Sequence, residues 1–186
     1  MAFPLTLLIA GIALWWLAHL FKRLAPERRA AMGDKGKGPV ALALLLAVVL
    51  MIVGFRMSDA SPDIWYPPYW LRHLNNLLVL FAIYLMSPGP AKGALFYRMR
   101  HPMLTGFALW AFAHLLVNGD LASILLFGAL LAWALIEMVV INRAEPAWTP
   151  PQKGSIAKDA MFLAASVLLL GLIGWIHGLL GYPVFG

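Results

Sequence analysis

The sequence predicts an all-α fold, a polytopic membrane helix bundle of about six transmembrane helices with both termini on the non-cytoplasmic side. Hydrophobic residues make up 62% of the chain and charged residues only 12%, whereas a soluble domain carries about 25% charged residues. The apolar residues form long blocks separated by short polar connections, the pattern of a chain that has lipid as its solvent. The length of 186 residues predicts a single transmembrane domain over residues 1–186.

Six apolar segments mark the expected helices. They are Phe3–Phe21, Val40–Phe55, Trp70–Ser87, Pro102–Asn118, Leu121–Asn142 and Ala160–Leu180. Most have the roughly 17–25 residues needed to cross a hydrocarbon core about 30 Å thick. The second is slightly short, and we expect it to include Gly38 and Pro39. The first lacks the basic n-region of a cleaved signal peptide and is followed by Lys22, so we expect it to stay as an anchor.

The positions of the basic residues predict how the chain is oriented across the membrane. Twelve of the 14 Lys and Arg residues lie in the connections after the first, third and fifth segments, while the other side keeps only Arg56 and Arg72. By the positive-inside rule the three basic connections face the cytoplasm. These residues do not form a patch with interleaved aromatic residues, so we expect the lipid bilayer as partner and no nucleic acid.

Two connections carry turn signals. Asn118, Gly119 and Asp120 separate the fourth and fifth segments. Glycine suits a helix C-terminus and aspartate suits an N-cap, so these segments are expected to form a tight antiparallel hairpin. The connection Ser58–Tyr69 is rich in proline and aromatic residues and is expected to lie at the outer interface.

The sequence has no cysteine, which excludes disulfides, Cys-ligated zinc, iron–sulfur clusters and thiolate catalysis. A metal or heme would need His, Met, carboxylate or Tyr ligands. Ionisable side chains inside spanning helices are costly and are therefore candidates for function. All five histidines lie in or beside the apolar segments, at His19, His73, His101, His114 and His177.

Depth separates the histidines. At about 1.5 Å per residue, His19 lies roughly 5 Å inside the cytoplasmic end of the first segment, and His101 lies at the cytoplasmic mouth of the fourth. His114 is roughly 18 Å into the fourth segment, in its outer half, and His73 and His177 also lie toward the outer side. His101 and His114 point to nearly opposite faces of a helix, so we do not expect them to share a metal. The alternative for each histidine is a hydrogen bond to a neighbouring helix.

Small residues accompany two of the histidines. Glycines share one helical stripe with His177, so a flat cofactor is expected to lie against this glycine stripe with the imidazole reaching its metal. Small residues also leave room for a macrocycle beside His114. Close helix packing is the alternative for both sets. The sets are Gly171, Gly174, Gly178 and Gly181 around His177, and Gly106, Trp110 and Asn118 around His114.

Charged groups gather at the cytoplasmic mouth of the expected hairpin. Arg98, Arg100 and His101 open the fourth segment, and Glu137, Arg143 and Glu145 end the fifth. Glu137 lies inside the apolar block, so it is expected to pair with Arg100, His101 or Arg143. A purely structural ion pair is the alternative to a binding site.

Two stretches carry a family resemblance. The runs Arg100–Leu104 and Trp110–Asp120 resemble the signature of the NnrU family, with further matches at His19, Lys158–Asp159 and His177. The resemblance covers nearly the whole chain. The family is associated with bacterial denitrification, specifically with producing active nitrite and nitric oxide reductases. The resemblance therefore implies a multi-pass protein of the bacterial inner (cytoplasmic) membrane, with other membrane or denitrification proteins as partners.

The resemblance also implies a heme. A plant relative, zeta-carotene isomerase, is a membrane enzyme whose b-type heme is held by histidines, and this points to His114 and His19 as axial ligands of the iron. The expected depth in the membrane instead favours His177 or His73 as the second ligand, because both lie toward the outer side, as His114 does. The isomerase has a cysteine near its helical histidine, where this chain has Trp110–Ala113, so an isomerase mechanism by thiolate exchange cannot operate here.

A second resemblance competes. The Arg-His-Pro sequence at Arg100 and His101, followed by Gly106, is similar to the opening of isoprenylcysteine and phospholipid methyltransferases, which bind S-adenosylmethionine at the cytoplasmic mouth. It implies Arg100, His101, Glu137 and Glu145 as an alternative cofactor site, although the paired glutamates of those enzymes are missing. Three hypotheses follow, namely a heme-b-binding NnrU-type protein, an S-adenosylmethionine-dependent methyltransferase, and a cofactor-free membrane scaffold or assembly factor. The sequence assigns no catalytic residue.

Overall fold

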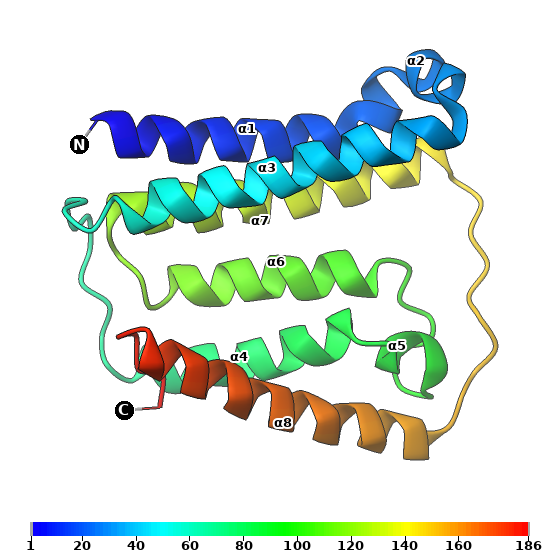
Figure 1. Ribbon diagram of the computed structural model, residues 1–186. Coiled ribbons are helices and arrows are strands. Elements are labelled where there is room, and N and C mark those ends of the chain that lie inside the picture. The colour runs from blue at the N-terminus through cyan, green and yellow to red at the C-terminus, as the bar shows by residue number, and fades with distance from the viewer. Residues whose placement is uncertain (1, 186) are drawn as a thin grey trace. The chain divides into compact units, whose positions relative to one another are not determined.

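Six apolar helices lie where the sequence predicts them. The structure, a computed structural model, describes residues 2–185, and within them it has helices and no strands, apart from one isolated bridge between Asp63 and Asp120. The predicted all-α membrane bundle is thereby confirmed. The apolar helices are α1 (Ala2–Leu24), α3 (Lys37–Arg56), α4 (Leu71–Met86), α6 (Pro102–Leu115), α7 (Leu121–Ala144) and α8 (Ile156–Leu179), and the short helices α2 (Pro26–Ala31), η1 (Gly33–Gly36) and α5 (Gly89–Lys92) lie in the connections (Figure 1).

The six helices differ in length. Within the described residues, α1, α3, α7 and α8 are long and apolar enough to cross a membrane, and α4 and α6 are shorter. At 1.5 Å per residue α4 extends about 24 Å and α6 about 21 Å, less than the roughly 30 Å of the hydrocarbon core. The expected end of the fourth segment at Asn118 is wrong, because the Asn118 backbone N–H and side-chain amide both donate to the His114 carbonyl in a turn that closes α6 at Leu115.

Large apolar side chains stand exposed on the long helices, as expected for a chain in lipid. On α8, Leu168 is 76% exposed and Trp175 is 62% exposed. A helix that is apolar on every side is stable only where no side meets water. The chain is therefore a multi-pass membrane protein, and the predicted orientation of its termini stays a prediction.

The described residues fall into two compact units. The first takes in the chain up to Tyr66 together with Gly119–Trp133, and the second takes in Pro67–Asn118 together with the chain from Ala134 onward. Helix α7 therefore begins in the first unit and ends in the second. The single-domain organisation stays a prediction.

The first unit is built on an antiparallel pair, α1 and α3, packed at backbone distance. A Cβ added at Gly54 would meet the Leu8 backbone, and one added at Gly11 would lie 2.7 Å from the Met51 backbone nitrogen. Leu8 and Ala47 are fully buried in this contact. Small residues allow the dispersion contacts that join helices in lipid, where the hydrophobic effect does not.

Gly54 can be tested by substitution. Gly54→Leu is expected to lower the free energy of unfolding by about 1–3 kcal/mol, because the added side chain would meet helix backbone that cannot turn away. The measurement is thermal unfolding in detergent. Gly38→Leu is the matched control, since among the described residues no atom beyond its own helical turn lies within 4 Å of a Cβ built there. Equal unfolding midpoints for the two variants would contradict the close approach of α1 and α3.

The connection before α4 caps the start of α7. The Asp120 side chain accepts a hydrogen bond from the Ser123 backbone N–H at 2.9 Å, so the predicted N-cap is confirmed. Glycine is required at position 119 because a Cβ there would overlap the Trp65 carbonyl. A helix leaves the N–H groups of its first turn without partners inside the helix. In α7 the Leu121 N–H donates to the Pro62 carbonyl and the Ala122 N–H donates to the Ser61 Oγ, each at 2.9 Å.

The second unit is centred on α4, which packs against both α6 and α8. Its core cluster is Val79, Ile83 and Ala113, with Leu78, Trp110, Leu170 and Ile173 packed around it. The second half of α7 runs antiparallel to α6, because the His101 side chain bonds Asn142 while Thr105, further along α6, contacts the earlier Met138. This direction agrees with the predicted hairpin, and the tight packing expected of it stays a prediction.

Candidate functional site

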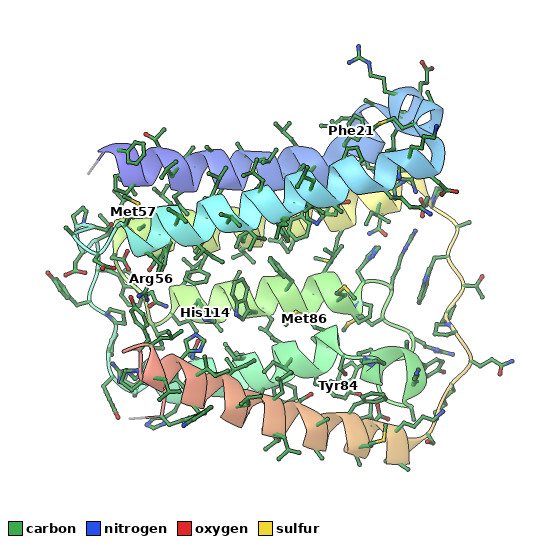
Figure 2. All side chains as sticks on the ribbon, in the orientation of Figure 1. Phe21, Arg56, Met57, Tyr84, Met86 and His114 are labelled. Carbon is green, nitrogen blue, oxygen red and sulfur yellow. The ribbon has the colours of Figure 1, made fainter. Side chains whose placement is uncertain are left out.

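Two histidines lie at the same end of the second unit. His114 lies in the last turn of α6 and His177 in the last turn of α8, and the two imidazoles are close enough to interact electrostatically. One turn earlier on each helix, Trp110 and Ile173 pack on the same core cluster. The core therefore sets α6 and α8 so that both histidines emerge at one end, where Figure 2 labels His114.

The hydrogen bonds of these histidines determine which ring nitrogen carries the proton. The Nδ1 of His114 bonds the Trp110 carbonyl at 2.8 Å, and the Nδ1 of His177 bonds the Ile173 carbonyl at 2.8 Å. A carbonyl oxygen only accepts, so Nδ1 carries the proton and the Nε2 of the neutral imidazole keeps its lone pair. Donation of the other ring N–H to a carbonyl is the usual support of a metal-ligating histidine. In both rings Nε2 is therefore the nitrogen with the lone pair, and its use as a metal ligand stays a prediction.

Two adjacent amides of α4 strengthen this end of the unit. Asn75 is buried and, in the amide orientation that satisfies both its polar ends, donates to the Ala113 carbonyl at 2.9 Å. Asn76 donates to the Val184 carbonyl at 2.9 Å. This amide pair was not among the residues predicted from the sequence. The feature that could have indicated it is two consecutive amides inside an apolar segment.

The C-terminal residues fold back onto α8. Gly181 has a φ of 89°, a left-handed conformation that reverses the chain, and the Tyr182 N–H then donates to the His177 carbonyl at 2.8 Å. Phe185 and Val184 occupy the space where Gly174 would carry a Cβ. The idea that a flat macrocycle lies on the glycine stripe therefore needs correction at Gly174, because the chain's own C-terminal residues cover it.

The residues beside His114 serve packing. The space beside Gly106 is filled by α4, since a Cβ there would lie 2.7 Å from the Ala82 carbonyl oxygen. The room for a macrocycle expected at Gly106 is therefore taken by a helix. Trp110 belongs to the core cluster, and its ring centroid lies 4.9 Å from that of His114.

His19 lies in the first unit, in an aromatic setting. Its ring centroid is 4.2 Å from that of Trp15 and 4.5 Å from that of Trp133. Its Nδ1 donates to the Trp15 carbonyl at 2.9 Å, so it has the same tautomer as His114 and His177. The pair implied by the resemblance, His114 with His19, would take one ligand from each unit and stays a prediction. His73 is exposed on α4 beside Tyr69.

The mouth predicted to face the cytoplasm is assembled through backbone and amide groups. Arg100 donates to the Glu145 backbone carbonyl, and the His101 Nε2 bonds the Asn142 side-chain oxygen at 2.8 Å. The structure therefore brings Arg100 and Glu145 together, but through the carbonyl of Glu145. Glu137 is only 9% exposed, and its pairing with a base of the mouth stays a prediction.

A buried acid, Asp159, anchors the start of α8. The sequence indicated it only as part of the family resemblance and assigned it no role. Asp159 is 3% exposed, and its carboxylate accepts hydrogen bonds from the Tyr84 hydroxyl at 2.5 Å, from the Ala94 N–H at 2.6 Å and from the Leu95 N–H at 3.2 Å. These bonds join α4, α8 and the connection that leads to α6. Gly93 touches the same carboxylate, so the chain there has no space for a side chain.

A comparison with known protein families shows to which family the chain belongs. A family described as NnrU protein matches residues 7–184, nearly the whole chain. This chain belongs to the NnrU family. No curated protein and no solved structure gave a match. The match includes both members of the histidine pair and, apart from the first five residues of α1, all six apolar helices.

The number of protein ligands in the histidine pair bears on the kind of metal group expected in this NnrU-family chain. Within residues 2–185 no group of three His, Asp or Glu side chains could hold a metal ion. A heme iron carries four equatorial nitrogens of its own and needs only axial ligands from the protein. Two histidines are the number of protein ligands that a heme takes, and heme binding at His114 and His177 stays a prediction.

Proposed function

We propose that this NnrU-family chain binds a b-type heme through the Nε2 atoms of His114 and His177. The observation that supports this most strongly is the shared hydrogen-bond pattern, in which both imidazoles donate Nδ1–H to their own helix and lie within electrostatic reach of each other. A bound heme would supply electron-transfer or redox chemistry. His19 is the alternative second ligand, by resemblance to the family's relative.

The physical chemistry of the bilayer makes the ligands decisive. A b-type heme has no covalent tether, so its affinity comes from axial ligation and from burial of the macrocycle. In lipid, burial of the ring gains little over leaving it among acyl chains. The Nδ1–carbonyl bonds hold the ring planes and raise the basicity of Nε2. The C-terminal ends of α6 and α8 also bear partial negative charge, which favours a cationic iron centre nearby.

The proposed biological role rests on the family. We propose that the protein acts in the bacterial inner membrane in support of denitrification, through the production of active nitrite and nitric oxide reductases or a related redox role. Its proposed partners are other membrane or denitrification proteins.

An absorption spectrum of protein purified from heme-sufficient cells tests the cofactor. The expected result is a Soret band with α and β bands that sharpen on reduction. The His114→Ala/His177→Ala double variant, prepared in parallel, controls for heme bound without specific ligands. Absence of heme in the wild type would end the proposal. Binding of S-adenosylmethionine instead would favour the methyltransferase site at Arg100, His101, Glu137 and Glu145, and binding of neither would favour the scaffold.

A further inference from the structure

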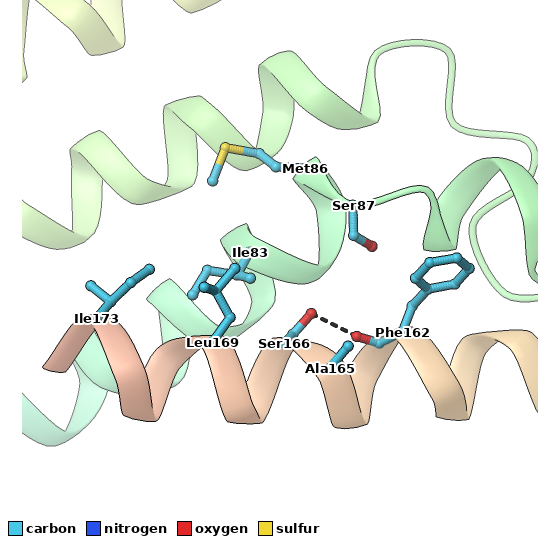
Figure 3. A pocket seen from close by; sticks show the side chains of 8 residues that line it. All are labelled: Ile83, Met86, Ser87, Phe162, Ala165, Ser166, Leu169 and Ile173. Carbon is cyan, nitrogen blue, oxygen red and sulfur yellow. Dashed lines mark hydrogen bonds between the residues drawn. The ribbon is translucent and has the colours of Figure 1, made fainter. Parts of the chain in front are cut away.

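A groove runs along the second unit between α4 and α8, and it shares Ile83 and Ile173 with the core cluster behind the histidine pair. Its volume is about 280 Å³. Ile83 and Met86 line it from α4, and Phe162, Leu169 and Ile173 line it from α8 (Figure 3). The lining side chains of α8 recur every three or four residues, so they form one stripe along the helix. The groove is therefore elongated and almost entirely hydrocarbon.

The two hydroxyl groups in the groove are already used. Ser87 donates to the Tyr84 carbonyl at 2.7 Å, and Ser166 donates to the Phe162 carbonyl at 2.8 Å, the bond drawn in Figure 3. Neither hydroxyl proton is available to a ligand, and a polar ligand buried there would lose its hydrogen bonds to water without replacement. The groove therefore suits an apolar chain.

Cations stand at one end of the groove. Lys158 lies one turn before Phe162 on α8, and Lys92 ends α5, whose Gly89 packs beneath the Phe162 Cβ. Both lysines are exposed. The neighbouring acid, Asp159, is buried and directs its carboxylate to Tyr84 and to two backbone N–H groups, away from this surface. The end of the groove therefore presents positive charge beside an apolar channel.

We propose that the groove holds an acyl chain of an anionic phospholipid whose phosphate lies between Lys92 and Lys158. Both lysines belong to the basic connections predicted to face the cytoplasm, so the lipid would come from the inner leaflet. Lipid tails are as apolar as the groove, which means that the tail alone gives little preference over bulk bilayer. The preference comes from the charge of the headgroup. This inference is independent of heme binding.

Titration of the detergent-solubilised protein with phosphatidylglycerol, followed by native mass spectrometry, tests the headgroup contact. Each lysine removed should weaken binding about fivefold, so Lys92→Gln/Lys158→Gln should bind roughly 25-fold more weakly than the wild type. Lys22→Gln/Lys35→Gln removes the same charge from the first unit and should bind as the wild type does. Equal affinity for the two double variants, or equally tight binding of phosphatidylcholine with the same chains, would overturn the proposal.

A pair of tryptophan substitutions tests the acyl chain. Ala165 lines the groove and Ala164 does not, so Ala165→Trp fills it while Ala164→Trp adds the same bulk elsewhere on α8. Only Ala165→Trp should lower phosphatidylglycerol binding, by about fivefold, because a tail excluded from the groove draws the phosphate away from one of the two lysines. Circular dichroism checks that both variants fold. If Ala165→Trp does not fold, the lysine variants alone test the proposal. Equal binding by two folded tryptophan variants would show that the chain lies outside the groove.

Discussion

His114→Ala is expected to lose most of the bound heme. His114 would supply one of two axial bonds, and in lipid the macrocycle gains little else from the protein. Removal of a group that merely supports a metal ligand already lowers affinity about 10- to 100-fold, so loss of the ligand should lower it at least that much. The measurement is heme per protein by the pyridine hemochromogen assay, with the Soret absorbance as a second readout.

The remaining histidines provide the controls. His101→Ala should keep its heme, because His101 precedes α6 and bonds Asn142. His177→Ala should match His114→Ala, and His19→Ala should resemble the wild type. Loss in His19→Ala with retention in His177→Ala would transfer the second ligand to His19. Equal heme in His114→Ala and the wild type would refute the site.

Asp159→Ala is expected to cause the largest loss of stability, about 3–5 kcal/mol in the free energy of unfolding. The substitution leaves the Tyr84 hydroxyl and the Ala94 and Leu95 N–H groups without their acceptor, and each buried donor left unsatisfied costs about 1–3 kcal/mol. Thermal or denaturant unfolding in detergent measures the effect.

Two further variants show how much of that loss of stability comes from the hydrogen bonds of Asp159. Tyr84→Phe removes one donor and keeps the carboxylate bonded to the backbone, so its cost should be about 1–1.5 kcal/mol. Asp59 is an exposed acid of the first unit, and Asp59→Ala should change stability by less than about 0.5 kcal/mol. If Asp159→Ala were as mild as Asp59→Ala, the carboxylate would not be the anchor of α8.

Helix positions were predictable wherever hydropathy changes sharply. The expected extension of the second segment through Gly38 and Pro39 is confirmed by the start of α3 at Lys37. The end of α6 was not predictable in this way, because apolar residues continue past Leu115 through Leu116 and Val117. That end is made by hydrogen bonds to the His114 carbonyl, which hydropathy does not record.

The histidine pair was partly predictable, because depth along the helices favours His177 as a partner for His114. Its surroundings were not. A small residue one turn from an imidazole allows either a cofactor or a neighbouring backbone, and only tertiary packing shows that α4 fills the space at Gly106 and that the C-terminal residues cover Gly174. Asp159 is similar, since its Tyr84 partner lies 75 residues away in sequence.

The orientation of each imidazole by a carbonyl of its own helix has a consequence for evolution. A one-residue insertion in α6 ahead of Trp110 would preserve the bond from His114 to the carbonyl four residues earlier. It would also rotate the imidazole by about 100° relative to the start of the helix, so that it no longer faces α8. Insertions and deletions inside α6 or α8 are therefore expected to break the pair, while changes of length in the extended connection between Glu145 and Gly154 leave it intact.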